Sequence, residues 1–223
     1  MDLLKWIKSL DDLLFELMSW LVFWPVTLLR TAARPIGMMR YADAQLTRPE
    51  EEQYDEALSP PVFLILTLIV VHLAALALGQ PDEILANQRG LAKMVDNDTS
   101  AVAVRLVLFA AFPLIFAVML VVAKQRKLNR RSLQLPFYAQ CYPAAVFAAT
   151  LAVAAQIGIL KIGPSGLSAL LLLAASLWLT VVEAIWLRRV HSFGWPGAVA
   201  LAVIGMVLGT ATVLAAGQLL LGR

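Results

Sequence analysis

The sequence predicts an all-α membrane protein: a bundle of five transmembrane helices with N-terminal amphipathic helices at the membrane interface. Of its 223 residues, 61% are hydrophobic and 15% are charged, and the mean hydropathy is +0.78. A single water-soluble core of this size does not bury so much apolar surface. From residue 61 onward, apolar runs long enough to cross a bilayer follow one another with short loops. We expect interfacial helices over 1–45, a linker over 46–60 and one transmembrane domain over 61–223.

Residues 1–24 have the pattern of a helix that lies in the plane of the interface. One helical stripe holds the apolar residues Leu3, Leu4, Ile7, Leu10, Leu14, Met18 and Leu21. The charged residues fall mostly elsewhere, as in amphipathic surface helices. A second helix over 26–44 carries arginines that can reach lipid phosphates, each contributing about 1 kcal/mol near an anionic surface. The candidate phosphate ligands of the whole region are Lys5, Lys8, Arg30, Arg34 and Arg40.

Two other interpretations of this region stay open. In the first, the helices are only a lead-in that rests on the membrane, without a specific ligand. A spanning or re-entrant helix over residues 13–29 is the other alternative, although Glu16 and Pro25 disfavour it.

The linker over 46–60 joins an acidic segment to the first transmembrane helix. The segment "RPEEEQYDEA" suits water, and "SPP" at 59–61 suits the start of a helix. Ser59 can cap exposed amides, and proline fits the first turn, where no amide donor is missed. The first span is therefore expected over 61–78.

Four further spans follow, and their prolines and small residues indicate where the helices start, bend or pack closely. They are expected over 101–123, 137–160, 166–187 and 196–221. Pro113 predicts a kink at the centre of the second, whereas Pro136 is expected to open the third and Pro143 to break it. Gly205 and Gly209 form a small-xxx-small pair that allows close helix packing, which we expect within one chain rather than between subunits.

The orientation follows from the distribution of lysine and arginine, which are retained on the cytoplasmic side. The loop "KQRKLNRR" at 124–131 and the segment "RRVHSFGWP" at 188–196 are rich in these cations, and the alternate loops are not. This pattern predicts a cytoplasmic N-terminus and a periplasmic C-terminus in a multi-pass protein of the bacterial inner membrane.

Ionisable side chains within the spans are costly, so they mark candidate functional residues. His72 is eleven residues into the first span, near mid-membrane, and we expect Arg105 and Gln156 to reach a similar level. Glu183 and Gln140 form a possible second polar layer nearer the cytoplasm. One interpretation is a path for protons, ions or a small polar solute, in which His72 changes charge near neutral pH. The simpler interpretation is structural: each polar group is hydrogen-bonded between helices or extends its charged end to the membrane surface.

Motifs of enzymes are not found in this sequence. There is no P-loop, dinucleotide glycine fingerprint, HExxH or histidine-rich haem pattern, so we expect a protein that is not an enzyme and uses no cofactor or metal. The single cysteine, Cys141, excludes an intramolecular disulfide. The basic loop is a topology signal rather than a nucleic-acid site.

The order of the segments resembles that of the Yip1 family of small polytopic membrane proteins, including bacterial members labelled permease-like. The resemblance lies in "WPVTLLRTAARPIGMMRYA", a soluble stretch, a proline-led first span and five spans in all. It implies a membrane-organising or accessory role and offers no catalytic motif. Eukaryotic members are linked to vesicle traffic and small GTPase binding, but this sequence looks bacterial, so that partner class is not transferred.

Two hypotheses about function follow. The first is a non-enzymatic accessory or scaffold protein that binds membrane lipids or a partner membrane protein, or forms a homo-oligomer, through its N-terminal helices. The second is a small channel or permease with a path lined by His72, Arg105 and Glu183.

Overall fold

The structure is a computed structural model that describes residues 3–80, 85, 90–95, 97–190 and 194–222. Every regular element in these ranges is a helix. The α-helices are α1 (Leu3–Ala33), α2 (Pro35–Gln45), α3 (Pro60–Ala77), α5 (Asp98–Ala123), α6 (Arg130–Ile159), α7 (Leu167–Val190) and α8 (Trp195–Leu221). Two short 3₁₀ helices are η1 (Glu50–Glu52) and η2 (Gly90–Met94).

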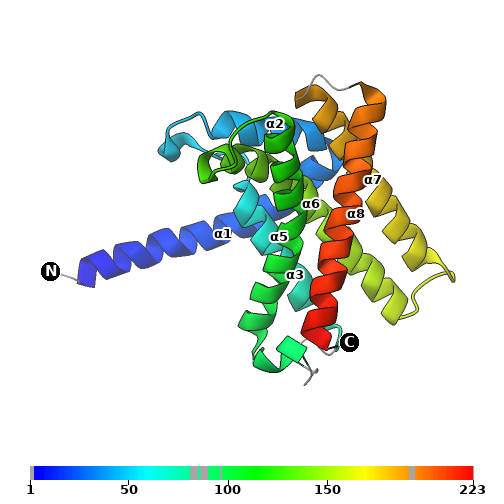
Figure 1. The fold of residues 1–223 in the computed structure, drawn as a ribbon. Coiled ribbons are helices and arrows are strands. Elements are labelled where there is room, and N and C mark those ends of the chain that lie inside the picture. The colour runs from blue at the N-terminus through cyan, green and yellow to red at the C-terminus, as the bar shows by residue number, and fades with distance from the viewer. Residues whose placement is uncertain (1–2, 81–84, 86–89, 96, 191–193, 223) are drawn as a thin grey trace.

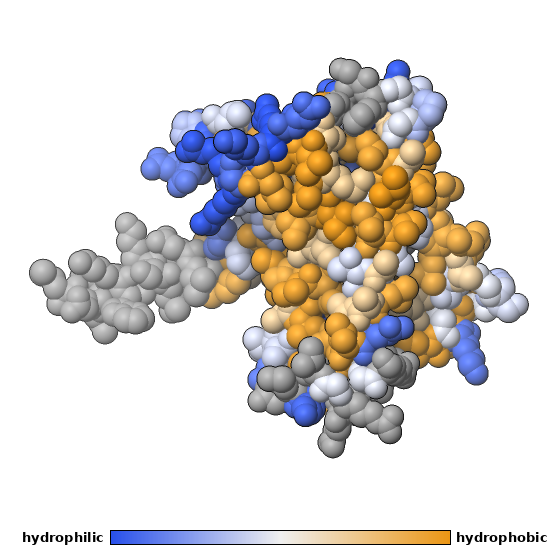
Figure 2. All heavy atoms as spheres, in the orientation of Figure 1, coloured by the Kyte–Doolittle hydropathy of each residue, from blue (hydrophilic) through white to orange (hydrophobic). Residues whose placement is uncertain are grey.

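Five of these helices, α3 and α5 to α8, are long and apolar enough to cross a membrane. Helix α6 packs against α3, α5 and α7, and α8 packs against α5 and α7 (Figure 1). Figure 2 shows an apolar band on the face of the bundle in view, with hydrophilic residues gathered at its two ends. The predicted all-α, five-helix membrane fold is therefore confirmed. We call the end that carries α2 and the loop at 124–129 the α2 end, and the opposite end the η2 end.

Proline does not interrupt α6, contrary to the sequence-based expectation. The helix begins at Arg130 rather than near residue 137, and Pro136 and Pro143 both lie inside it. Its start is set by a capping box, in which the side chain of Asn129 accepts from the amide of Ser132 at 2.9 Å. The cap satisfies amides that would otherwise be exposed, and packing of α6 on its neighbours offsets the bonds that proline removes.

The break in the N-terminal region also differs from the prediction. Helix α1 continues through Pro25 and ends at Ala33. Arg34 has φ −137° and ψ 58°, outside the helical region, and Pro35 starts α2. A residue before proline is disfavoured in the helical conformation, and proline is well suited to the first turn that follows.

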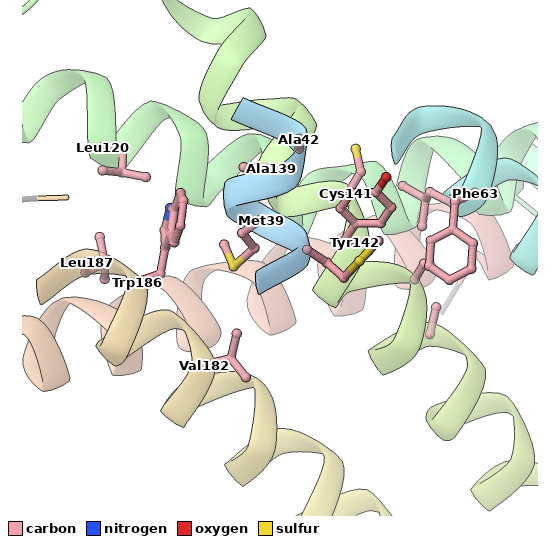
Figure 3. Close-up of a cluster of buried hydrophobic side chains, with 14 of the residues drawn as sticks. Met39, Ala42, Phe63, Leu120, Ala139, Cys141, Tyr142, Val182, Trp186 and Leu187 are labelled. Atoms are coloured by element: carbon pink, nitrogen blue, oxygen red, sulfur yellow. The ribbon is translucent and has the colours of Figure 1, made fainter. Parts of the chain in front are cut away.

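Helix α2 packs on the transmembrane bundle. Met39 and Ala42 are fully buried, and α2 contacts both α6 and α7. Figure 3 shows Met39 among side chains of the bundle. Placement of α2 therefore depends on burial against the bundle, while the predicted interfacial location of α1 and α2 stays a prediction.

Helix α1 projects from the bundle, crosswise to the long helices (Figure 1). Three hydrogen bonds hold its second half in place. The indole Nε1 of Trp24 donates to Thr67 Oγ1 at 3.0 Å, and Thr27 Oγ1 accepts from the amide of Leu58 at 3.2 Å. Arg30 Nη1 donates to the carbonyl of Glu56 at 2.8 Å. Side chains before residue 14, including the predicted phosphate ligands Lys5 and Lys8, lie outside the described residues.

The entrance to α3 is tied to the centre of the bundle. Tyr142 is fully buried on α6, and its hydroxyl donates to the carbonyl of Leu58 at 2.7 Å. Its ring also packs against Phe63, with 5.8 Å between the ring centroids (Figure 3). Leu58 thus bonds to α6 through its carbonyl and to α1 through its amide, so the linker joins α1, α3 and α6.

The two glycines of α8 meet α5 of the same chain. A Cβ atom at Gly209 would lie 2.6 Å from the ring of Phe112, and one at Gly205 would overlap the ring of Phe116. Both rings are buried in an apolar cluster with Met206. Close approach of the backbone of α8 to these rings therefore requires glycine at both positions.

Candidate functional site

The first polar group joins α3 and α5 near the η2 end. The Nη1 atom of Arg105 donates to Nδ1 of His72 at 2.9 Å. Because arginine only donates, Nδ1 of His72 must accept, which leaves the proton of the neutral ring on Nε2. This Nε2 is 3.7 Å from Oδ1 of Asp98. His72 therefore lies between a guanidinium and a carboxylate.

His72 and Asp98 both lie near the ends of their helices, and the depth of this group in a membrane stays a prediction. His72 is five residues before the end of α3, which corresponds to about 7.5 Å along the helix axis. Asp98 is the first residue of α5 and is exposed. Gln156, expected in the same layer, has a buried side-chain oxygen with no hydrogen-bond partner in the described part of the chain. The structure thus brings His72 to Arg105 but does not bond Gln156 to either.

The second polar group joins α6 and α7 in the interior. The Nε2 atom of Gln140 donates to Oε2 of Glu183 at 2.9 Å. Gln140 is 1% exposed and Glu183 is fully buried. The other carboxyl oxygen, Oε1, has no hydrogen-bond partner within the described residues. Glu183 is thus bonded to a neutral amide rather than to Arg188, which instead lies 4.2 Å from the ring centroid of Trp195.

A third site, which sequence reasoning missed, is an open cavity of about 270 Å³ at the α2 end. Four helices line it: α2, α5, α6 and α7. Its polar and charged lining residues are Asp43, Lys124, Arg126, Arg131, Ser132 and Trp186. In the sequence its charged residues lie in segments where charge is ordinary, and only the docking of α2 brings Asp43 to the others.

The electrostatics of this cavity are dominated by burial. Burial raises the pKa of Asp43 to about 6, while the positive charge of Lys124 acts in the opposite direction. Burial also lowers the pKa of Lys124, with the charge of Arg126 adding to this effect. Oδ1 of Asp43 has no hydrogen-bond partner among the described residues. Lys124 is therefore near enough to act on Asp43, but within the described residues no cation forms an ion pair with this carboxylate.

Replacing Asp43 with Asn is expected to remove a pH-dependent part of the stability. The folded protein holds the Asp43 proton more tightly than the unfolded chain, because its pKa is about 6 rather than 3.8. Asp43 therefore stabilises the fold fully below about pH 4, and this contribution is lost as the pH rises through about 6. Since Asp43 is only half-buried, we expect a change of about 1 kcal/mol between about pH 4.5 and about pH 7.5.

Thermal unfolding in detergent at the two pH values measures this effect. The wild-type protein should lose more stability on going to the higher pH than Asp43→Asn does. Asp55→Asn, which alters an exposed carboxylate in the linker, is the control and should behave like the wild type. Equal pH dependence in the wild type and Asp43→Asn would contradict the assignment.

The three arginines predicted to bind lipid phosphates lie in α1, in α2 and at the junction between them. Arg30 and Arg34 line a shallow hollow of about 390 Å³ together with Tyr41 and Glu56. The Nη1 atom of Arg30 is 4.0 Å from a carboxylate oxygen of Glu56. Arg40 is exposed on α2 outside this hollow. The structure therefore brings two of the three arginines together.

In comparisons with known proteins, no family model, curated protein or solved structure matches the chain.

Proposed function

We propose that this protein is a non-enzymatic accessory or scaffold protein of the membrane, which binds lipid or a partner membrane protein along α1. The observation that carries the proposal is a row of exposed apolar side chains on α1. Phe15 is 76% exposed, Leu21 is 69% and Met18 is 63%. Such a row on a helix outside the bundle is stable only when lipid or another protein covers it.

Attachment of α1 supports the same role. The bonds of Trp24, Thr27 and Arg30 fix the second half of the helix to α3 and the linker. The exposed apolar row is therefore presented by a long helix that is anchored at one end. An anchored helix loses little conformational freedom on binding, which favours association.

We further propose that the α2 end faces the cytoplasm of a bacterial cell and that the protein lies in the inner membrane. Basic residues at this end support the orientation, because short cytoplasmic loops retain lysine and arginine. They are Lys124, Arg126, Lys127, Arg130, Arg131, Arg188 and Arg189. Membership of the Yip1 family stays a prediction.

Replacing Phe15, Met18, Leu21 and Val22 together with serine tests the role of α1. Native mass spectrometry after gentle extraction should show lipid or a stoichiometric second protein on the wild type, and its loss from the variant. The control changes Phe15, Met18 and Val22 to leucine, which keeps the row apolar and should preserve binding. Equal binding by the serine variant and the wild type would overturn the proposal.

The alternative, a channel or permease, is tested separately in liposomes with a pH-sensitive dye. Flux that depends on the wild-type protein and is lost in both His72→Ala and Glu183→Gln would favour a conducting path. The buried, hydrogen-bonded state of Gln140 and Glu183 supports the structural role instead. We therefore expect no flux above that of protein-free liposomes.

A further inference from the structure

The cavity at the α2 end has a charged mouth and an apolar wall. Lys124, Arg126 and Arg131 are exposed side chains that line it. Asp43 is the one carboxylate among its lining residues. The apolar wall is formed by Leu120, Val121, Leu135, Pro136 and Val190. A ligand that matches this arrangement has a negative group, a positive group and an apolar part.

Two polar atoms at the cavity have no hydrogen-bond partner among the described residues, and they differ in kind. Oδ1 of Asp43 is an acceptor, and the indole Nε1 of Trp186 is a donor. Trp186 lines the cavity and is only 3% exposed. Figure 3 shows its ring beside Leu120, which lines the same cavity. Buried polar groups in native proteins are nearly always satisfied, so both atoms point to a bound ligand.

The location identifies an amphiphile. Lys124 directly follows the end of α5 and Arg131 lies in the first turn of α6, so the cations stand where the apolar spans meet the basic loop. This is the boundary at which lipid phosphates lie. The start of α6 also presents the positive end of its helix dipole, which favours an anion. The apolar wall continues from this boundary toward the hydrocarbon region.

We propose that this cavity binds a zwitterionic headgroup, a phosphodiester joined to a primary ammonium, as in a phosphoethanolamine lipid. The phosphate interacts with Lys124, Arg126 and Arg131, and the ammonium donates to Oδ1 of Asp43. Trp186 Nε1 donates to a phosphate or ester oxygen, and an acyl chain lies along the apolar wall. A lipid that carries only a phosphate offers no ammonium to Oδ1 of Asp43 and brings two negative groups together.

The inference deepens the proposed lipid-binding function and rests on it, but at a surface separate from the exposed row of α1. Full-length protein in detergent is titrated with short-chain phosphatidylethanolamine and phosphatidylglycerol, and binding is followed by native mass spectrometry. We expect the ethanolamine lipid to bind about tenfold more tightly. Asp43→Asn should reduce this preference to less than about threefold, because the carboxylate that selects the ammonium is removed.

Further variants separate the roles of the lining residues. Trp186→Phe keeps an aromatic side chain, although a smaller one, and removes the N–H donor, so it should weaken both lipids by a similar factor. Arg126→Gln, a change at an exposed side chain, should also weaken both and leave the preference intact. Asp55→Asn is the control and should change neither affinity nor preference.

Soluble O-phosphoethanolamine distinguishes a lipid from a free phosphate compound that carries the same groups. Failure of the soluble compound to compete supports a lipid, whereas competition as strong as that of the lipid overturns the assignment to a lipid. Equal binding of the two lipids by the wild type, or an unchanged preference in Asp43→Asn, overturns the headgroup assignment. If this assignment fails while the serine variant of α1 still loses its lipid or partner, the proposed function stands without it.

Discussion

Adding a single methyl group at Gly205 or Gly209 is expected to separate α8 from α5 and destabilise the bundle. The new Cβ would overlap the ring of Phe116 in the first case and lie 2.6 Å from the ring of Phe112 in the second. Phe116 is 1% exposed and Phe112 is 3% exposed, so neither ring can swing into open space. Overpacking of this kind costs about 1–3 kcal/mol per site.

Thermal unfolding of Gly205→Ala and Gly209→Ala in detergent measures this cost as a lower midpoint. Gly217→Ala is a matched control on the same helix, since a Cβ there meets nothing within 4 Å. Alanine at that position should leave stability unchanged or raise it slightly, because glycine is the poorer helix former. If Gly205→Ala unfolds at the same temperature as Gly217→Ala, the close contact between α5 and α8 is wrong.

A second substitution, at the ring that Gly205 faces, gives a more specific test of this contact. Combining Gly205→Ala with Phe116→Leu removes the ring edge that the new methyl group meets. We expect the double variant to be more stable than the sum of the two single changes predicts, because the two sites share one contact. Strict additivity would show that the destabilisation arises elsewhere.

Removing only Gln140 or only Glu183 is expected to destabilise the bundle more than removing both. Gln140→Leu leaves a fully buried carboxyl group without its hydrogen-bond donor, and Glu183→Leu leaves the buried amide of Gln140 without its acceptor. A buried polar group that loses its partner costs about 1–3 kcal/mol. In the double leucine variant both polar groups are absent, so most of this cost should disappear.

A double-mutant cycle on thermal or denaturant unfolding measures the coupling between these two side chains. Thr212→Val is the control for a polar-to-apolar change, because Thr212 is exposed and, among the described residues, its hydroxyl bonds only within its own helix. It should have little effect on stability. A double variant that is as unstable as the two single variants combined would show that the pair does not act as a unit.

The membrane class and the five spans could be predicted from local sequence. The first span was expected over 61–78 and is Pro60–Ala77, and the last was expected over 196–221 and is Trp195–Leu221. These predictions succeed because the length of an apolar run is a local property that the thickness of the bilayer constrains.

The effect of each proline could not be predicted in the same way. Pro25, Pro136 and Pro143 lie inside helices, whereas Pro35 begins one. A proline in the interior of a helix removes one backbone hydrogen bond, whereas one in the first turn removes none. Whether the helix continues depends on how well its other residues pack against neighbours, which the local sequence does not reveal.

The candidate sites also differ in whether the local sequence reveals them. His72, Arg105 and Glu183 are conspicuous in the sequence because a charge within an apolar run is costly. Asp43 is not, since α2 is a polar segment and a carboxylate there is ordinary. It becomes unusual when α2 packs on the bundle and places it beside Lys124, in a cavity lined also by Trp186.

Composition and apolar run length thus establish that this is a five-span membrane protein, and they mark which ionisable residues enter the apolar spans. The folded arrangement establishes which of these residues meet: His72 with Arg105, and Gln140 with Glu183. The reason is physical. Insertion into a bilayer depends on the sum of local transfer free energies, whereas burial and pairing depend on side chains that are distant in the sequence and adjacent only after the helices pack.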